Sequence, residues 1–115
     1  MLLNLGATAT VCHINTKNIK EETKTADILF VACGSKHLVK KDWIKENVII
    51  IDIGINSVED KTKKRGYRLV RDVDFDDVKD KVSYITPVPG GVGPMTICML
   101  MKHTLQACKN LTLVN

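Results

Sequence analysis

Two unbroken apolar runs constrain the fold of this chain more than any other feature. They are Asp27–Ala32 (DILFVA) and Val48–Ile53 (VIIIDI), and they are closed by Gly34 and Gly54. A strand with one face in water alternates apolar and polar residues, whereas a short continuous apolar run is typical of a strand covered on both faces. The two runs therefore predict buried strands of a parallel sheet.

The remaining segments alternate between strand-like and helix-like patterns. Further strands are expected at Ala7–Cys12, Tyr67–Val70 and Ser83–Thr86, with a charged loop at Asn56–Gly66. Helices are expected at Ile19–Thr25, Lys40–Lys45, Asp74–Lys79 and Met95–Ala107, and a helix end is expected just before Gly6, its left-handed stop. Asn18 and Glu21 have the spacing of a capping box. Alternating strands and helices predict an α/β fold with a parallel sheet.

Composition and charge exclude several classes of protein. Hydrophobic residues make up 44% of the 115 residues and charged residues 26%, which excludes a disordered or low-complexity segment. The apolar runs are far shorter than the roughly 20 residues that span a bilayer, and the start lacks the basic residues of a signal peptide. The net charge is +4, but the charges are interspersed and aromatic residues make up 4%, so a solvated surface is favoured over a nucleic-acid interface.

The cysteines and the buried acid predict structural roles. Cys12, Cys33, Cys98 and Cys108 form no Cys-x-x-Cys pair and have no zinc-site spacing, so free buried thiols and no metal site are expected. Asp52 lies within an apolar run, and we expect it to hold a backbone amide rather than to act in catalysis.

Candidate ligand-binding loops follow the expected strands. In an open parallel sheet, ligands bind beyond the carboxyl ends of the strands. Here those ends are His13–Lys17, Cys33–Ser35, Gly54–Asn56 and Pro87–Pro94, and three of the four contain glycine, which lets the backbone approach a flat ligand. The loops predict a nucleotide or other planar ligand. The alternative is that their glycines only permit tight turns.

The segment Pro87–Thr96 carries the strongest signal. Prolines stiffen its backbone, three glycines remove side chains, and Pro94 stands near the first turn of a helix whose dipole points back into the loop. A rigid ledge without side chains at a helix N-terminus suits planar heterocycles, and an elaborate turn is the less favoured interpretation.

Thr86–Thr96 (TPVPGGVGPMT) resembles the signature of the methylenetetrahydrofolate dehydrogenase/methenyltetrahydrofolate cyclohydrolase family. The resemblance extends to Leu2–Asn4, Gly6–Ala7, Val11–His13, Thr16–Asn18, Ala26–Ile28, Asp52–Asn56, Gly66–Val70 and Asp72–Phe75. It implies a Rossmann-like domain that holds NAD(P) against the carbon to be oxidised. The family oxidises 5,10-methylenetetrahydrofolate by hydride transfer and hydrolyses the methenyl product to 10-formyltetrahydrofolate.

The resemblance also implies two sets of binding residues. The adenosine ribose and any 2′-phosphate would meet His13, Ile14, Asn15, Thr16 and Lys17. The rest of the cofactor would lie along Ala32, Cys33, Gly34, Gly54, Ile55 and Asn56, with Ile55 at the nicotinamide and Thr96 as a hydroxyl partner. The folate substrate would share the space lined by Pro89, Gly90, Gly91, Val92, Gly93 and Pro94.

Departures from the family pattern bear on the cofactor. Ile14 stands where a serine is common, and Asn15 replaces a frequent basic residue, although Lys17 remains close. No acidic residue ends the strand to grip a ribose diol, so NADP is expected as cofactor, with NAD as the alternative. Arg71 replaces a common glycine, which is expected to strain or re-route that turn. The resemblance further implies a homodimer in the cytoplasm, or in the mitochondrial matrix. The composition and the short apolar runs predict no nucleic-acid or membrane partner.

The resemblance implies an incomplete Rossmann-like fold. The family's first strand, its Gly-Arg-Ser phosphate loop and its folate-binding domain correspond to sequence ahead of Met1. We therefore expect residues 1–115 to be a partial NAD(P)-binding domain without the catalytic folate-binding N-terminal domain, and no catalytic residue within it. The alternative is a non-catalytic truncated isoform or fragment.

Overall fold

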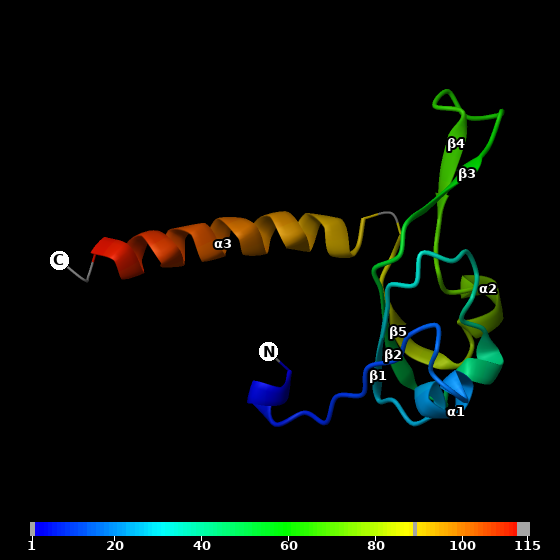
Figure 1. Ribbon diagram of the computed structural model, residues 1–115. Coiled ribbons are helices and arrows are strands. Elements are labelled where there is room, and N and C mark those ends of the chain that lie inside the picture. The colour runs from blue at the N-terminus through cyan, green and yellow to red at the C-terminus, as the bar shows by residue number, and fades with distance from the viewer. Residues whose placement is uncertain (1, 89, 113–115) are drawn as a thin grey trace.

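A three-stranded parallel sheet organises the chain, which a computed structural model describes over residues 2–88 and 90–112 (Figure 1). Its strands are β1 (Ile28–Val31), β2 (Val48–Asp52) and β5 (Val82–Ile85), in the order β1-β2-β5. The predicted parallel sheet of an α/β Rossmann-like fold is confirmed. Because the strands run in the same direction, their carboxyl ends meet at one edge of the sheet.

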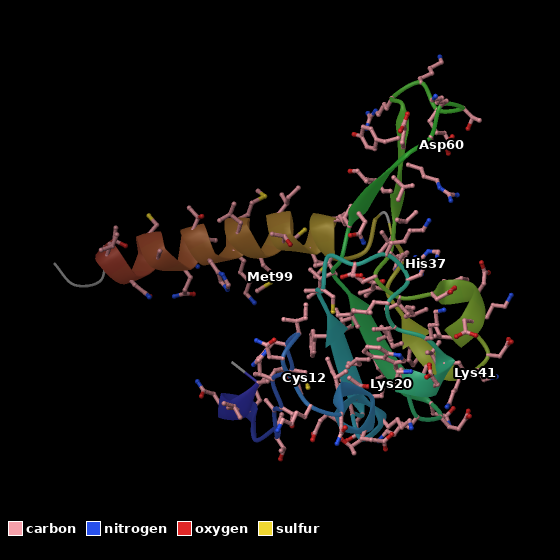
Figure 2. The ribbon with its side chains drawn as sticks, turned by 45° about the vertical axis from the view of Figure 1, so that its right-hand side comes forward. Cys12, Lys20, His37, Lys41, Asp60 and Met99 are labelled. Atoms are coloured by element: carbon pink, nitrogen blue, oxygen red, sulfur yellow. The ribbon has the colours of Figure 1, made fainter. Side chains whose placement is uncertain are left out.

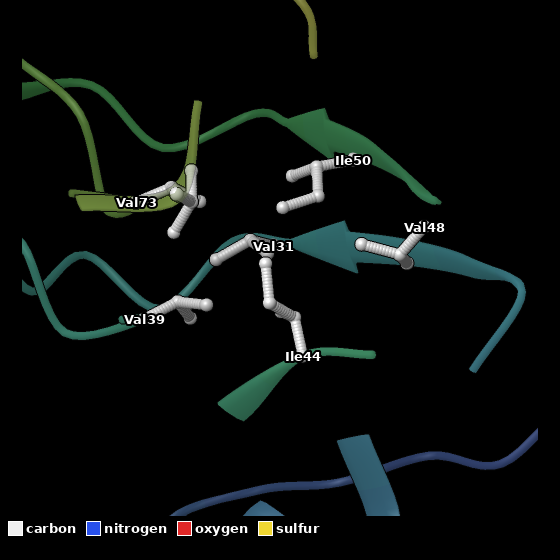
Figure 3. Packing of buried hydrophobic residues seen from close by; sticks show 7 residues of the cluster. Val31, Val39, Ile44, Val48, Ile50 and Val73 are labelled. Carbon is white, nitrogen blue, oxygen red and sulfur yellow. The ribbon is translucent and has the colours of Figure 1, made fainter. Parts of the chain in front are cut away.

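Short helices cover one face of this sheet. They are α1 (Ile19–Lys24), the 3-10 turn η2 (Lys41–Trp43) and α2 (Phe75–Val78). Figure 1 shows α1 and α2 on the same side of the strands. The buried core lies between these layers and consists of Val31, Val39, Ile44, Val48, Ile50, Val73 and Val78 (Figure 3).

The opposite face of the sheet is open among the described residues, so the prediction that the strands are covered on both faces is wrong there. Ile28 and Phe30 are each 49% exposed, and Tyr84 is 72% exposed. The reason is the course of α3 (Val92–Thr112), which runs away from the sheet and has no buried residue (Figure 1). The apolar pattern of the strands identified both faces correctly as apolar, but the described helices cover only one.

The predicted strand at Ala7–Cys12 is also wrong. No backbone hydrogen bond joins residues 8–12 to another strand in the described part of the chain. Its Thr- and Val-rich composition suits a strand, but a strand forms only where a neighbour completes its ladder. The predicted helix end is a 3-10 turn, η1 (Leu3–Leu5), and Gly6 at φ 78° is its left-handed stop, as expected.

The first four residues of the predicted charged loop are a strand of a hairpin. β3 (Asn56–Glu59) pairs in antiparallel fashion with β4 (Tyr67–Val70), so only the residues between them form the turn. Asn56–Glu59 is too polar to be identified as a strand from its own pattern, and it is stabilised by the non-local pairing with β4.

Helix boundaries differ from the prediction for local reasons. Asn18 has φ 53° and makes no side-chain cap, so the predicted capping box is wrong; its carbonyl oxygen accepts the Glu21 amide at 2.8 Å instead. Lys40–Lys45 contains only the single turn η2. The final helix begins at Val92, three residues before the predicted start, so Pro94 lies within its first turn rather than in an irregular loop.

The four cysteines are free, but the prediction that they are buried holds for none of them fully. Cys33, Cys98 and Cys108 are exposed and Cys12 is half-buried. Cys98 and Cys108 are exposed because α3 runs away from the sheet and has no buried residue (Figure 1). Within the described ranges, no helix is both long enough and apolar enough to cross a membrane.

Candidate functional site

A cavity of about 240 Å³ lies at the carboxyl end of β2. The chain leaving β2 forms one wall, and the loop after β5 with the start of α3 forms the other; Figure 1 shows these two segments meeting at that edge of the sheet. The lining residues are Asp52, Ile53, Ile55, Pro87, Val88, Gly90, Gly91, Val92, Gly93 and Thr96. The structure therefore brings the predicted Ile55 together with four residues of the predicted substrate set and with Thr96.

The three glycines that line this cavity differ in backbone conformation and in what a Cβ would contact. Gly90 has φ 106°, a conformation that L side chains rarely adopt. A Cβ at Gly91 would collide with the Pro87 carbonyl oxygen and lie 3.2 Å from the Thr86 Cβ, whereas a Cβ at Gly93 would meet no atom within 4 Å. Gly91 is thus required by the fold of the loop, and Gly93 leaves open space. Pro89, also predicted in this set, lies outside the described residues.

Thr86 ties the two walls of the cavity together. Its hydroxyl accepts the Asp52 amide at 2.8 Å and donates to the Asp52 carbonyl oxygen at 3.1 Å, which links the end of β5 to the end of β2. Thr96 donates its hydroxyl to the Val92 carbonyl oxygen at 3.1 Å, one turn back along α3, and its lone pairs remain able to accept a hydrogen bond.

Asp52 fills the structural role that was predicted. Its carboxylate accepts the backbone amides of Gly54 and Val73, each at 3.1 Å. Burial raises the pKa of Asp52, and the nearby Asp72 carboxylate raises it further against the lowering effect of the two amides. The side chain thus fixes the backbone that leaves β2.

Asp72 is the residue of this region that sequence reasoning missed. Its side chain is fully buried and accepts the amides of Cys33 at 2.6 Å, Gly34 at 2.8 Å and Ser35 at 3.0 Å. It also accepts the side-chain amide of Asn56 at 2.6 Å. The only sequence signal was its place in the segment Asp72–Phe75, because its partners lie 16 to 39 positions earlier in the chain.

The same carboxylate explains Gly54. A Cβ at Gly54 would collide with all three atoms of the Asp72 carboxylate. Gly54 is fully buried and has no left-handed φ, so close approach to Asp72, rather than backbone conformation, requires a glycine here. The alternative interpretation, that this glycine only permits a tight turn, therefore does not explain why a glycine is required here.

Ala32, Cys33 and Gly34 form an exposed strip that does not line the cavity. Their connection to it runs through Asp72, which binds the amides of this strip and the side chain of Asn56. Partial desolvation of the Cys33 thiol raises its pKa, and the Asp72 carboxylate raises it further, so the neutral thiol is favoured.

The predicted segment His13–Lys17 lies apart from the cavity. It forms a turn in which Thr16 donates its amide to the His13 carbonyl oxygen and the Thr16 hydroxyl oxygen accepts the His13 amide, both at 2.8 Å. The Asn15 amide donates to His13 Nδ1 at 3.1 Å, while the side chains of Ile14 and Lys17 are exposed. Figure 2 shows Cys12, directly before this turn, well separated from His37 in the loop after β1.

Arg71 is accommodated without a strained backbone. Position 71 has no left-handed φ, and its carbonyl oxygen accepts the His37 amide at 3.1 Å. The guanidinium lies 4.7 Å from the centre of the Phe75 ring, a cation–π contact that offsets part of its burial. One terminal nitrogen is buried without a hydrogen-bond partner among the described residues. The expected backbone strain at this position is therefore not observed.

The family follows from a comparison of the whole chain with known families. Residues 1–112 match the family model described as tetrahydrofolate dehydrogenase/cyclohydrolase, NAD(P)-binding domain. The chain belongs to this family. The predicted resemblance is thereby confirmed, and the cavity and its flanking loops lie in an NAD(P)-binding domain.

Relatives and solved structures agree with this assignment. The mitochondrial C-1-tetrahydrofolate synthase of Saccharomyces cerevisiae is 59% identical over 109 residues, which are 95% of this chain and 11% of that protein; a cytoplasmic synthase from Spodoptera frugiperda is similar as well. The crystal structure of the Campylobacter jejuni bifunctional enzyme FolD, a methylenetetrahydrofolate dehydrogenase/cyclohydrolase, is 51% identical with a TM-score of 0.82, covering 95% of this chain and 36% of that chain.

A fourth match carries a cofactor. The Trypanosoma brucei methylenetetrahydrofolate dehydrogenase-cyclohydrolase, in complex with NADP and an inhibitor, is 45% identical with a TM-score of 0.76 and covers 83% of this chain and 32% of that chain. The chain thus spans little more than a third, or less, of the proteins that it matches.

Proposed function

We propose that this NAD(P)-binding domain works in the oxidation of 5,10-methylenetetrahydrofolate and in the hydrolysis of the methenyl product to 10-formyltetrahydrofolate. The observation that carries the proposal is the cavity of about 240 Å³ between Ile55 and the glycine segment that opens α3. The bound dinucleotide supplies the hydride acceptor. This chain supplies a site whose shape fits a flat ring, because there is open space beside Gly93 and an apolar side chain at Ile55.

The residues of the chain bind and orient. Ile55 contacts the nicotinamide end of the cofactor, and Gly90–Pro94 with Thr96 border the space that the cofactor shares with the folate. The α3 N-terminus directs its positive dipole end toward this space, which favours electron-rich ligand atoms there. His13–Lys17 meets the adenosine ribose, and Ala32–Gly34 lies along the cofactor.

We further propose NADP as the preferred cofactor. Lys17 is exposed beside the turn, and residues 2–17 contain no carboxylate to repel a phosphate. A charge-assisted hydrogen bond to phosphate contributes about 1.5–3 kcal/mol, so one lysine is sufficient to decide the preference. The Trypanosoma brucei relative in complex with NADP supports the same choice.

The groups that bind folate and transfer protons are proposed to come from sequence outside these 115 residues, which would then form a partial domain. A homodimer is proposed on the resemblance, and its test is the mass of the purified protein by light scattering. The cytoplasm is the proposed compartment, with the mitochondrial matrix as the alternative, because relatives are named for both.

A chimaeric enzyme tests the proposed function. In it, this chain replaces the matching segment of the Campylobacter jejuni bifunctional enzyme, to which it is 51% identical. Formation of NADPH on addition of 5,10-methylenetetrahydrofolate and NADP is expected. A folded chimaeric enzyme that binds neither NADP nor NAD would contradict the proposal and favour the non-catalytic alternative.

A further inference from the structure

We infer that Asp72 is a positioning residue. It fixes the relative position of the two loops of the cofactor site, which follow β1 and β2. That this is a cofactor site rests on the proposed function, whereas the contacts of Asp72 with the two loops do not depend on it. Asp72 is fully buried, and each of the four groups that its carboxylate contacts at hydrogen-bond distance is a donor. A carboxylate in these surroundings satisfies every one of them, and no neutral side chain of the same size does.

The loop after β1 is held through its backbone. Oδ2 accepts the amides of Cys33 and Gly34, and Oδ1 accepts the amide of Ser35. Successive amides that converge on one point form a nest of the kind that binds anions. Here an internal carboxylate occupies the nest. These amides are consequently not free for a cofactor phosphate, and Cys33 and Gly34 meet a ligand through carbonyl oxygens and side-chain atoms.

The loop after β2 is held through a side chain. The Asn56 carboxamide donates to Asp72 Oδ1 at 2.6 Å and lies 3.5 Å from the Val70 carbonyl oxygen. Asn56 directly follows Ile55 of the cavity, and Gly54 directly precedes it against the same carboxylate. One buried carboxylate therefore contacts both loops.

Asp72→Asn is the test variant, because it keeps the size of the side chain. The introduced amide oxygen still accepts from one pair of donors, but the introduced NH₂ group faces the other pair, so two donors lose their acceptor. Asp76→Asn is the matched control, since the Asp76 side chain is 91% exposed. Val78→Ala is the control for lost stability, because Val78 is buried in the core on α2 and none of the four donors to Asp72 lies on that helix.

Two measurements test the role of Asp72 and the proposed function independently of each other. Hydrogen–deuterium exchange of the chimaeric enzyme without bound cofactor reports on the amides of residues 33–35. The KM for NADP in the chimaeric enzyme reports on the site. For Asp72→Asn we expect exchange at residues 33–35 and the KM for NADP each to rise about tenfold, equivalent to about 1.4 kcal/mol, with the KM for folate unchanged. Both controls leave the KM for NADP unchanged, although Val78→Ala lowers the Tm.

The double variant Asp72→Asn/Asn56→Asp is expected to have a lower KM for NADP and slower exchange at residues 33–35 than Asp72→Asn, because it offers the introduced NH₂ group a carboxylate acceptor. Asn56→Ala removes a single hydrogen bond and is the milder variant should Asp72→Asn fail to fold; a smaller rise in KM is expected. Unchanged exchange at residues 33–35, an unchanged KM, or a double variant no better than Asp72→Asn would each overturn the inference. A parent chimaeric enzyme that binds no dinucleotide would overturn the proposed function, while the exchange measurement would still decide the role of Asp72.

Discussion

Substitution of two neighbouring glycines distinguishes a residue needed by the ligand from a residue needed by the fold. A Cβ at Gly93 meets no atom within 4 Å, so Gly93→Val projects into open space beside the cavity. Gly93 is the second residue of α3, where valine is favoured over glycine by a few tenths of a kcal/mol. The Tm of the variant is therefore expected within a few degrees of the parent. If the space holds the reacting rings, a displacement of about 1 Å lowers kcat/KM by about 100-fold.

Gly91→Val is the matched comparison. Its Cβ collides with the Pro87 carbonyl oxygen, a backbone atom that cannot move without the loop, so overpacking destabilises the fold by about 1–3 kcal/mol. Its loss of activity would accordingly say nothing specific about the ligand. The assay is kcat/KM for NADP-dependent oxidation in the chimaeric enzyme, with Tm measured on the same samples. Near-parental kcat/KM for Gly93→Val would refute the assignment of this space to the reacting rings.

Four further predictions follow from the described contacts. Gly54→Ala pushes the Asp72 carboxylate out of its four hydrogen bonds; loss of two of them lowers the free energy of unfolding of the chimaeric enzyme by about 3–6 kcal/mol, which urea titration measures. Burial raises the pKa of Asp52 above its ordinary value of 3.8, so the folded state holds that proton more tightly. The contribution of Asp52 to stability therefore falls as pH rises from about 3.8 through the folded pKa and is constant above it. Asp52→Asn removes this slope in urea titrations of the chimaeric enzyme across that window. Lys17→Gln reduces the ratio of kcat/KM for NADP to that for NAD by about tenfold or more; an unchanged ratio would show that Lys17 points away from the phosphate. Residues 1–115 alone bind a hydrophobic dye, unfold without a sharp transition and bind no NADPH at micromolar concentration, because the open sheet face and α3 expose apolar side chains; a sharp transition with micromolar binding would contradict this.

The elements predicted well are those whose signal is local. The apolar runs at Asp27–Ala32 and Val48–Ile53 became β1 and β2, and Tyr67–Val70 became β4 with the predicted bounds. The elements predicted poorly depend on partners. Ala7–Cys12 has the composition of a strand and no neighbour to pair with, whereas Asn56–Glu59 has a polar composition and a neighbour in β4. Pairing rather than propensity decided both segments.

The candidate site divides in the same way. Gly90–Gly93 could be recognised from the sequence because prolines and glycines that shape a rigid ledge stand next to one another in the chain, and the structure places them around one cavity with Ile55. Asp72 could not be recognised, because the reason for its carboxylate is spread over Cys33–Ser35 and Asn56, and no short window contains both the acceptor and its donors.

A glycine and a buried acid that are distant in the sequence can each be required by the other. Gly54 was explained by a turn, and Asp72 only by its place in a matching segment, yet each requires the other: the carboxylate needs the space that a missing Cβ leaves, and the glycine is needed because the carboxylate is there. A buried carboxylate that faces donors alone has little tolerance for a neutral replacement, since each donor left without an acceptor costs about 1–3 kcal/mol. The same group sets the spacing of two loops that must contact one extended ligand. Stability and positioning therefore depend on one side chain, and substitutions at position 72 that lower the stability of the fold also move the loops at which the dinucleotide is proposed to bind.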